Sequence, residues 1–296
     1  MGAEVFRLYY LQKAEKDELH DYSHMRLDEL ENMASSSRGI AVDTEELAIE
    51  VVGAIVSGNT AEIVLRVTAK RLDSVLRENG RNYCFMDYVT ILIDSLPGGG
   101  WEVMTPALSY NDTVASLAPN QFELHYRLIA GEPLDRDTTL TIPLRDFGFY
   151  REGHRGFEIL YPGNWQVEIA LDPAADTSRR GRVDEELTLG DYLFSVDDMQ
   201  ITPLACTIHL TCKEDEAYLD EHTMDILQVF SEETNRCTLT LADGRRLDSS
   251  HFEIYCRAGG PEYGINLSFC GPVAVEDIVS VQIFEKEFFI KDLQGA

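Results

Sequence analysis

The sequence is short of positive charge, and this excludes some classes of partner. Its 296 residues carry 25 Lys and Arg against 52 Asp and Glu, a formal net charge of −27. Such a surface repels phosphate backbones and anionic lipid headgroups, because both are bound largely through Lys and Arg. We therefore expect no nucleic-acid partner.

Catalytic signatures are also missing. The sequence has no GxSxG elbow, P-loop or HExxH motif. Asp135 and Asp137 flank Arg136 ahead of an expected strand, where alternating charges are typical of turn and edge residues. Asp197 and Asp198 are adjacent, and neighbours on a strand point to opposite faces, so they are not expected to pair as acid and base. We predict no catalytic residues, no cofactor and no enzymatic activity.

The cysteines and histidines lack the spacing of a metal site. No CxxC pair occurs, and most cysteines share strand parity with apolar residues, which favours buried free thiols but leaves a disulfide open. The six are Cys84, Cys206, Cys212, Cys237, Cys256 and Cys270. His20 and His24 have the i, i+4 spacing of two ligands on a helix, but no third ligand is evident. We predict surface positions for both histidines and no metal. The acidic run 213–222 is expected to be a solvated loop rather than a calcium site.

Long apolar runs are absent as well. No stretch reaches the ~18 apolar residues of a membrane-spanning helix, and the N-terminus has no apolar signal core. Read alone, this indicates a soluble chain. The opening Met1-Gly2-Ala3 also suits a piece cut from a longer protein.

What the sequence does contain is alternation of apolar and polar residues. Residues 60–70 read TAEIVLRVTAK, which predicts a strand with Ile63 and Leu65 in a core and Glu62 and Arg66 in water. More than ten segments repeat this pattern between short turns, so the fold class is mainly β. A sandwich module has about 100 residues, so this length suits two.

We predict two tandem immunoglobulin-like β-sandwiches, over residues 38–175 and 185–296. Strands are expected in the first at 46–56, 60–70, 84–95, 101–109, 121–130, 138–145 and 164–171. In the second they are expected at 187–196, 199–212, 225–231, 236–242, 251–257, 263–270, 278–284 and 286–291. The polar stretch 172–186 has no apolar period and is predicted to be a linking loop.

An amphipathic α-helix is predicted over residues 4–35. Apolar pairs recur at a spacing of eleven, close to the helical period, and form one stripe. They are Leu8 and Leu11, Leu19 and Tyr22, and Leu30 and Met33. The serines and Gly39 near 35–39 end the helix. Two roles stay open: the stripe packs on the first β domain, or it pairs as a stalk with another chain.

Aromatic residues near predicted turns offer a binding hypothesis. Trp101 and Trp165, with Tyr150 and Tyr161, are candidates for stacking on a sugar. The alternative for each tryptophan is packing in a core or between domains. Trp101 and Trp165 are the candidate ligand contacts.

The order of segments resembles a known family. A helix followed by GIAVDTEELAIEVVGAIVSGNTAEIVLRVTAK is similar to the start of the outer region in DUF4179-type proteins of Firmicutes. The segments at 163–172, 199–210, 241–248 and 265–283 lie where that family has similar strands. Those proteins are membrane-anchored and often described as anti-sigma-factor-like. The resemblance implies a short cytoplasmic region, one membrane helix and an outer part like this chain, which itself lacks the first two.

The resemblance implies a non-enzymatic extracytoplasmic domain that senses or binds something at the outer face of the cytoplasmic membrane. The partner would be an unknown protein or cell-envelope ligand, and the family supplies no site residues to carry over. The alternative is a cell-surface adhesion or carbohydrate-binding module without a signalling role. Oligomeric state and any sigma factor stay open.

Overall fold

The structure is a computed structural model, and it describes residues 2–35, 39–75, 81–88, 91–93, 103–104, 107–110, 117–131, 133–134, 138–151, 156–172, 178–214, 216–233, 236–259 and 262–295. As predicted, the fold is mainly β, and among the described residues all strand pairs are antiparallel. The chain divides into two compact units. The first unit comprises Met1–Phe6 and Met33–Ala174, and the second comprises Arg7–Asn32 and Ala175–Ala296.

Two sheets form the first unit. One has the order β1-β2-β3-β8-β6 with β7 also paired to β8, and the other has the order β10-β9-β4 with β5 paired to β9. The strands of the first sheet are β1 (Gly39–Asp43), β2 (Leu47–Ser57), β3 (Thr60–Ala69), β6 (Val103–Met104), β7 (Ala107–Tyr110) and β8 (Gln121–Ile129). Those of the second are β4 (Arg81–Asp87), β5 (Leu92–Ile93), β9 (Thr139–Arg151) and β10 (Phe157–Ala170).

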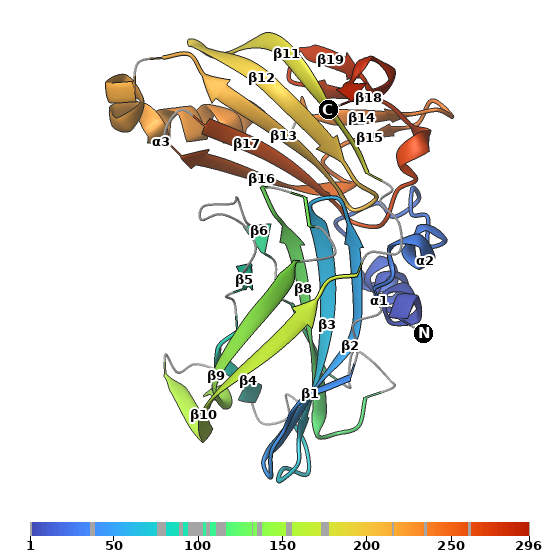
Figure 1. Cartoon of the computed structure of the whole chain (residues 1–296), viewed down its shortest axis with the longest axis vertical. Helices are drawn as coiled ribbons and strands as arrows, with labels where there is room; N and C mark the ends of the chain where they lie inside the picture. Colours follow the sequence, from blue (N-terminus) through green and yellow to red (C-terminus); the bar gives the residue numbers. More distant parts are fainter. Residues whose placement is uncertain are drawn as a thin grey trace. The chain divides into compact units, whose positions relative to one another are not determined.

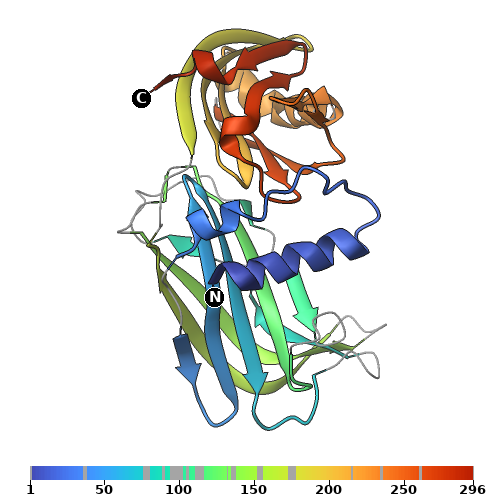
Figure 2. The same ribbon diagram turned by 90° about the vertical axis from the view of Figure 1, so that its right-hand side faces the viewer.

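The core of the first unit lies between these sheets. Figure 2 shows the yellow-green strands of the second sheet behind the blue and green strands of the first. Phe147 of β9 is central, with its ring 5.6 Å from that of Phe85 and 6.1 Å from that of Phe122. Since Phe85 belongs to one sheet and Phe122 to the other, the aromatic side chains join the two layers.

Pro143 lies inside β9, a strand with neighbours on both sides. On one side it pairs with Gln166 of β10. On the other, the described pairs with β4 end at Arg145 and the described pairs with β5 begin at Thr141. Proline has no N–H to donate, and no described residue of β4 or β5 pairs with it.

The outward face of β3 does not meet water as the alternation predicted. Glu62 is only 4% exposed, and it pairs with Arg127, its cross-strand neighbour on β8. Four residues further along β3, Arg66 lies 2.8 Å from Glu123 of β8. The expectation for Glu62 was wrong because Arg127 neutralises it across the ladder, which permits burial of both charges.

The second unit also contains two sheets. Their orders are β16-β17-β13-β12-β11-β20 and β15-β14-β18-β19. The first consists of β11 (Arg179–Leu189), β12 (Tyr192–Ile201), β13 (Ala205–Cys212), β16 (Phe252–Gly259), β17 (Glu262–Phe269) and β20 (Gln294–Gly295). The second consists of β14 (Thr238–Leu241), β15 (Arg246–Leu247), β18 (Ile278–Ile283) and β19 (Lys286–Phe289). A helix, α3 (Glu216–Glu233), follows β13 (Figure 1).

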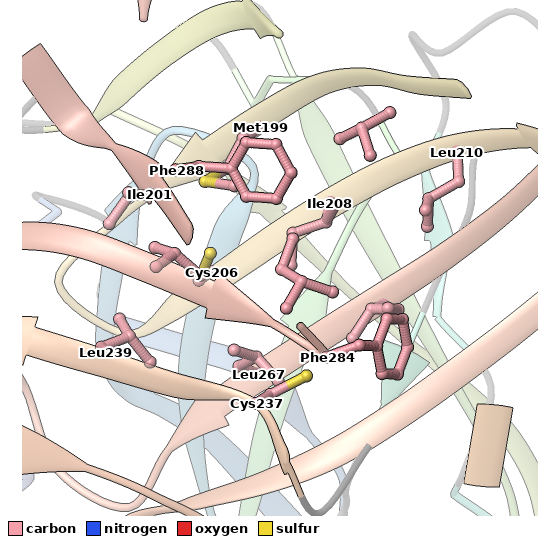
Figure 3. Close-up of a cluster of buried hydrophobic side chains, with 14 of the residues drawn as sticks. Met199, Ile201, Cys206, Ile208, Leu210, Cys237, Leu239, Leu267, Phe284 and Phe288 are labelled. Carbon is pink, nitrogen blue, oxygen red and sulfur yellow. The ribbon is translucent and has the colours of Figure 1, made fainter. Parts of the chain in front are cut away.

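One hydrophobic core joins both sheets of this unit. Figure 3 shows Cys206 and Ile208 of β13 in the same cluster as Leu239 of β14 and Phe288 of β19. Phe230 of α3 also enters this core and stacks on the ring of Tyr263 at 5.6 Å. Cys206 and Ile208 are thus buried on one face of β13, as the shared parity of cysteines and apolar residues predicted.

The single helix predicted over 4–35 is wrong. Helix α1 (Gly2–Lys16) ends early, residues 17–28 are not helical, and a short helix α2 (Glu29–Met33) follows. The eleven-residue stripe is not a packed face either, since Leu19 is 84% exposed whereas Phe6 and Tyr10 are buried. Asp17 accounts for the break, because its carboxylate accepts a hydrogen bond from the Leu19 amide and turns the chain.

Two further expectations in the second half were wrong. The predicted linking loop 172–186 contains most of the long strand β11. Its alternation is hidden, because a register shift between Arg182 and Glu185 changes the parity of the strand. The predicted strand 225–231 and the predicted loop 213–222 both contribute to α3. The run ILQVF at 226–230 is short and apolar, and such runs fit either structure.

All six cysteines are free thiols in the structure. Burial raises the pKa of Cys84 and Cys237 to about 12 and that of Cys256 to about 11.

We expect Cys256, which is partly exposed, to react with a disulfide reagent at pH 8 roughly 100-fold more slowly than a free thiol, because little of it is thiolate. The absorbance of the thiolate that the reagent releases measures this rate. Six thiols should react after unfolding without reductant, and a lower number would indicate a disulfide.

Candidate functional site

Polar contacts with distant parts of the chain gather at Asp17–Asp28, hereafter the docking segment. Asp17 organises its start: the carboxylate accepts hydrogen bonds from the Leu19 amide at 2.9 Å and the Tyr22 hydroxyl at 2.8 Å, and it lies 2.8 Å from Nδ1 of His20. Burial opposes ionisation, but the bonds from Tyr22 and His20 outweigh it and lower the pKa of Asp17 to about 2. The turn therefore keeps a charged carboxylate over the physiological pH range.

Backbone hydrogen bonds fasten the docking segment to the rest of the second unit. The Asp21 amide donates to the carbonyl of Ser250 at 2.7 Å, and the Arg26 amide donates to the carbonyl of Pro272 at 2.7 Å. The Arg245 guanidinium donates to the Ser23 carbonyl at 3.1 Å. These contacts join residues more than 200 positions apart in sequence, so tertiary packing alone brings them together.

Side chains extend this attachment. Arg26 lies 3.0 Å from Asp277 and 2.8 Å from Asp28. A Cβ atom added to Gly271 would lie 2.9 Å from Cγ of Met25, so the two residues approach closely. Glycine at this position permits the docking segment to pack against the backbone.

His24 and His251 form the buried centre of the site. His24 Nε2 donates to the Gly271 carbonyl at 3.3 Å, and the two imidazole rings lie 5.4 Å apart. His251 Nε2 lies 3.4 Å from the carboxylate of Asp21. The prediction that His24 is a surface residue was wrong, because the chain folds the docking segment back rather than continuing a helix.

A turn after β15 presents His251. Asp248 accepts hydrogen bonds from the Ser250 hydroxyl at 2.6 Å and the Ser250 amide at 3.0 Å, and it lies 3.0 Å from His251 Nδ1. The bonds from Ser250 lower the pKa of Asp248 to about 2, with His251 adding to the shift. The Ser250 hydroxyl also lies 2.9 Å from Nδ1, but that nitrogen accepts from the Asp248 amide at 3.2 Å. The arrangement thus supports the turn rather than activating Ser250.

Asp197 and Asp198 lie on the same face of their sheet, contrary to the prediction. A bulge between Val196 and Asp198 inserts Asp197 as an extra residue in β12. Asp197 accepts from the Thr211 hydroxyl at 2.6 Å, and Asp198 lies 3.0 Å from Nδ1 of His209. Burial would raise the pKa of Asp198, but the His209 contact outweighs it and lowers the pKa. Each carboxylate therefore has its own partner, and the two do not share a proton.

The predicted aromatic contacts are only partly described. Trp101 lies outside the described residues, as do Asp135 and Asp137. Trp165 is half-buried on β10, and its ring meets that of Phe85 edge to face at 5.6 Å. Tyr161 stacks on Phe147 at 5.6 Å. Trp165 and Tyr161 thus pack against the core of the first unit, whereas Tyr150 is 40% exposed and meets the ring of Phe157 edge to face at 4.9 Å.

His20 and His24, which the sequence placed at ligand spacing, do not converge on one site. His20 contacts Asp17, whereas His24 contacts Gly271. Among the described residues, no three His, Cys, Asp or Glu side chains gather in a way that would hold a metal ion. Within the same ranges, no helix combines the length and apolar character needed to cross a bilayer.

Sequence reasoning missed most of this site. His251, Asp248 and Asp277 carry no motif that sets them apart from the other polar residues of turns. One local signal was available: Asp248-Ser-Ser250 has the composition of a side-chain-supported turn. No pattern linked that turn to residues near the N-terminus.

Comparison with known proteins gives a fold relationship. No protein-family model and no curated protein matches the chain. Among solved structures, the chain is similar to the crystal structure of the conserved domain protein from Bacillus anthracis, with a TM-score of 0.50 and 9% identity. The similarity covers 83% of this chain and 75% of that one. At this identity the likeness shows the fold alone.

Proposed function

We propose that this chain is a non-enzymatic extracytoplasmic module of a membrane-anchored, anti-sigma-factor-like protein of the DUF4179 type, and that it senses or binds a component of the cell envelope. The observation that carries the proposal is the docking segment. A stretch near the N-terminus is attached to a folded β unit through contacts such as Arg26 with Asp277, 251 residues away in sequence.

Attachment of this kind suits a conformational signal. The Arg26 and Asp277 side chains are each more than 40% exposed, so their ion pair contributes little to stability. A partner that binds the attached or the released form more tightly shifts the equilibrium by the difference between its two affinities. If a membrane helix precedes this segment, as the resemblance implies, release of the segment would act on the anchored end.

We also propose that each unit is an immunoglobulin-like sandwich. The support is that each has two antiparallel sheets and one hydrophobic cluster that includes residues of both sheets. Sandwiches of this type serve widely as binding modules, which is consistent with an interaction role but comes from analogy of fold.

Cell-surface labelling tests the location. Intact cells that express the complete natural gene are treated with an amine-reactive reagent that does not cross membranes, and the protein is then recovered. We expect labelling without lysis. Labelling only after the cells are broken would contradict the extracytoplasmic assignment.

A charge reversal tests the role of the docking segment. Arg26→Glu would place a third carboxylate beside Asp28 and Asp277 and weaken attachment. We expect the transcript profile of cells carrying this variant to change in a defined set of genes. The matched control is Arg71→Glu, which breaks an exposed pair with Glu45 in the first unit. An unchanged profile for Arg26→Glu, with normal surface display, would contradict a signalling role.

A further inference from the structure

His24 is a titratable side chain buried where the docking segment meets the second unit. It is 2% exposed, and its Nδ1 atom makes no hydrogen bond to the part of the chain that the structure describes. Since Nε2 donates to Gly271, the neutral ring carries its proton on Nε2 and a lone pair on Nδ1. A second proton would therefore place a positive charge on a buried ring beside that of His251.

We propose that protonation of His24 releases the docking segment from the second unit, so that attachment responds to pH. The inference deepens the proposed function, because it names the proton as one input at the same site. It concerns a property of the folded chain that can be measured whether or not the protein lies outside the membrane.

The charged and titratable groups near His24 come from the docking segment and from the elements packed against it. Asp21 and His251 act on the charge of His24, Asp248 contacts His251, and the Arg245 guanidinium donates to the carbonyl of the neighbouring Ser23. The carboxylates of Asp21 and Asp248 lie 3.4 Å and 3.0 Å from the two ring nitrogens of His251. The ring of His251 lies 5.4 Å from that of His24.

The balance of these effects disfavours the charged His24 ring. Burial is the largest cause and the nearby His251 is the second, and together they lower the pKa of His24 from 6.5 to about 4. The carbonyl oxygens of Gly271 and Asp21 and the Asp21 carboxylate act in the opposite direction but do not compensate.

The sign of the response follows from proton linkage. A released His24 has its ordinary pKa of 6.5, whereas the attached one has a pKa of about 4. Attachment is therefore fully favourable above pH 6.5 and weakens as the pH falls towards 4. At pH 5 the released form binds nearly one proton more than the attached form. The equilibrium constant for attachment is therefore roughly 30-fold lower than at pH 8.

Hydrogen exchange on the full chain measures this directly. The Asp21 and Arg26 amides donate to Ser250 and Pro272, so exchange in a peptide covering residues 17–28 reports release. After correction for the intrinsic pH dependence of exchange, we expect protection of this peptide to fall roughly 30-fold between pH 8 and pH 5. Protection of β13 in the same unit should stay constant, which separates release from unfolding.

Variants assign the effect to the ring. His24→Gln keeps a side-chain N–H for the Gly271 carbonyl but cannot become charged, so its protection should not depend on pH. The matched control His222→Gln, in α3, should respond like the natural protein. If His24→Gln does not fold, His251→Gln serves instead, and it should reduce the response because the second cause of the low pKa is removed.

Two results overturn the proposal. One is a constant protection of residues 17–28 in the natural protein between pH 8 and pH 5, whatever the variants do. The other is an equal loss of protection in His24→Gln, which would place the titrating group elsewhere. A pH response with unchanged transcripts in Arg26→Glu would instead support this inference and count against the signalling role alone.

Discussion

Replacing Gly148 with alanine is expected to destabilise the first unit by about 3 kcal/mol or more, because the added methyl group has no space. A Cβ atom at this position would lie 1.9 Å from the carbonyl oxygen of Glu158 on the paired strand β10. That atom belongs to the backbone, so no side-chain rotation relieves the overlap. Relief requires β10 to move away from β9, which weakens the ladder beside the aromatic side chains around Phe147.

Urea unfolding followed by tryptophan fluorescence measures this effect. Trp101 and Trp165 both belong to the first unit, so the signal reports that unit. The matched control is Gly156→Ala, where an added Cβ meets nothing within 4 Å. We expect its midpoint to stay close to that of the natural protein. Equal midpoints for the two variants would show that β9 and β10 do not approach as closely as the structure indicates.

Replacing Arg127 with methionine is expected to cost about 3–5 kcal/mol, since it takes the arginine charge away from a buried carboxylate. Glu62 and Arg127 face each other across β3 and β8, and both side chains are largely buried. Methionine fills a similar volume, so the loss reflects charge rather than a cavity. The free energy of unfolding of the first unit, from the same fluorescence assay, checks the value.

Two further variants separate burial from simple loss of an ion pair. Arg71→Met breaks an exposed pair with Glu45 and should cost less than about 1 kcal/mol. The double variant Glu62→Gln/Arg127→Met removes both charges, and we expect it to recover much of the stability lost by Arg127→Met alone. If Arg71→Met and Arg127→Met are equally destabilising, the Glu62 carboxylate must reach water after the change.

The sequence predicted the strands of the first unit well where alternation continues without a break. The expected strands at 46–56, 60–70 and 121–130 correspond to β2, β3 and β8 within one or two residues. Prediction failed where the parity changes, because the shift between Arg182 and Glu185 disguises β11 as a polar loop. It failed again at α3, where Ile226, Val229 and Phe230 have helical spacing but form a run short enough for a strand.

The candidate site was almost invisible in the sequence. His24 was noticed, but only as a possible ligand beside His20 on a helix that the structure does not continue past Lys16. Its neighbours Gly271 and His251 lie more than 220 positions away along the chain. The adjacent Asp197 and Asp198 show the same limit on a smaller scale, since only the bulge in β12 places both on one face.

The sequence alone determined the mainly β class, the inward faces of most strands and the acidic surface, because these follow from the residue at each position and its near neighbours. The tertiary structure determined which charged residues are buried and which turn contacts the docking segment. In the sequence, Glu62 and His24 look like ordinary surface residues. In the fold, Arg127 lies beside Glu62 and His251 lies beside His24. Burial of a polar group depends on a partner that the fold supplies from a distant part of the chain, and a local pattern carries no information about that partner.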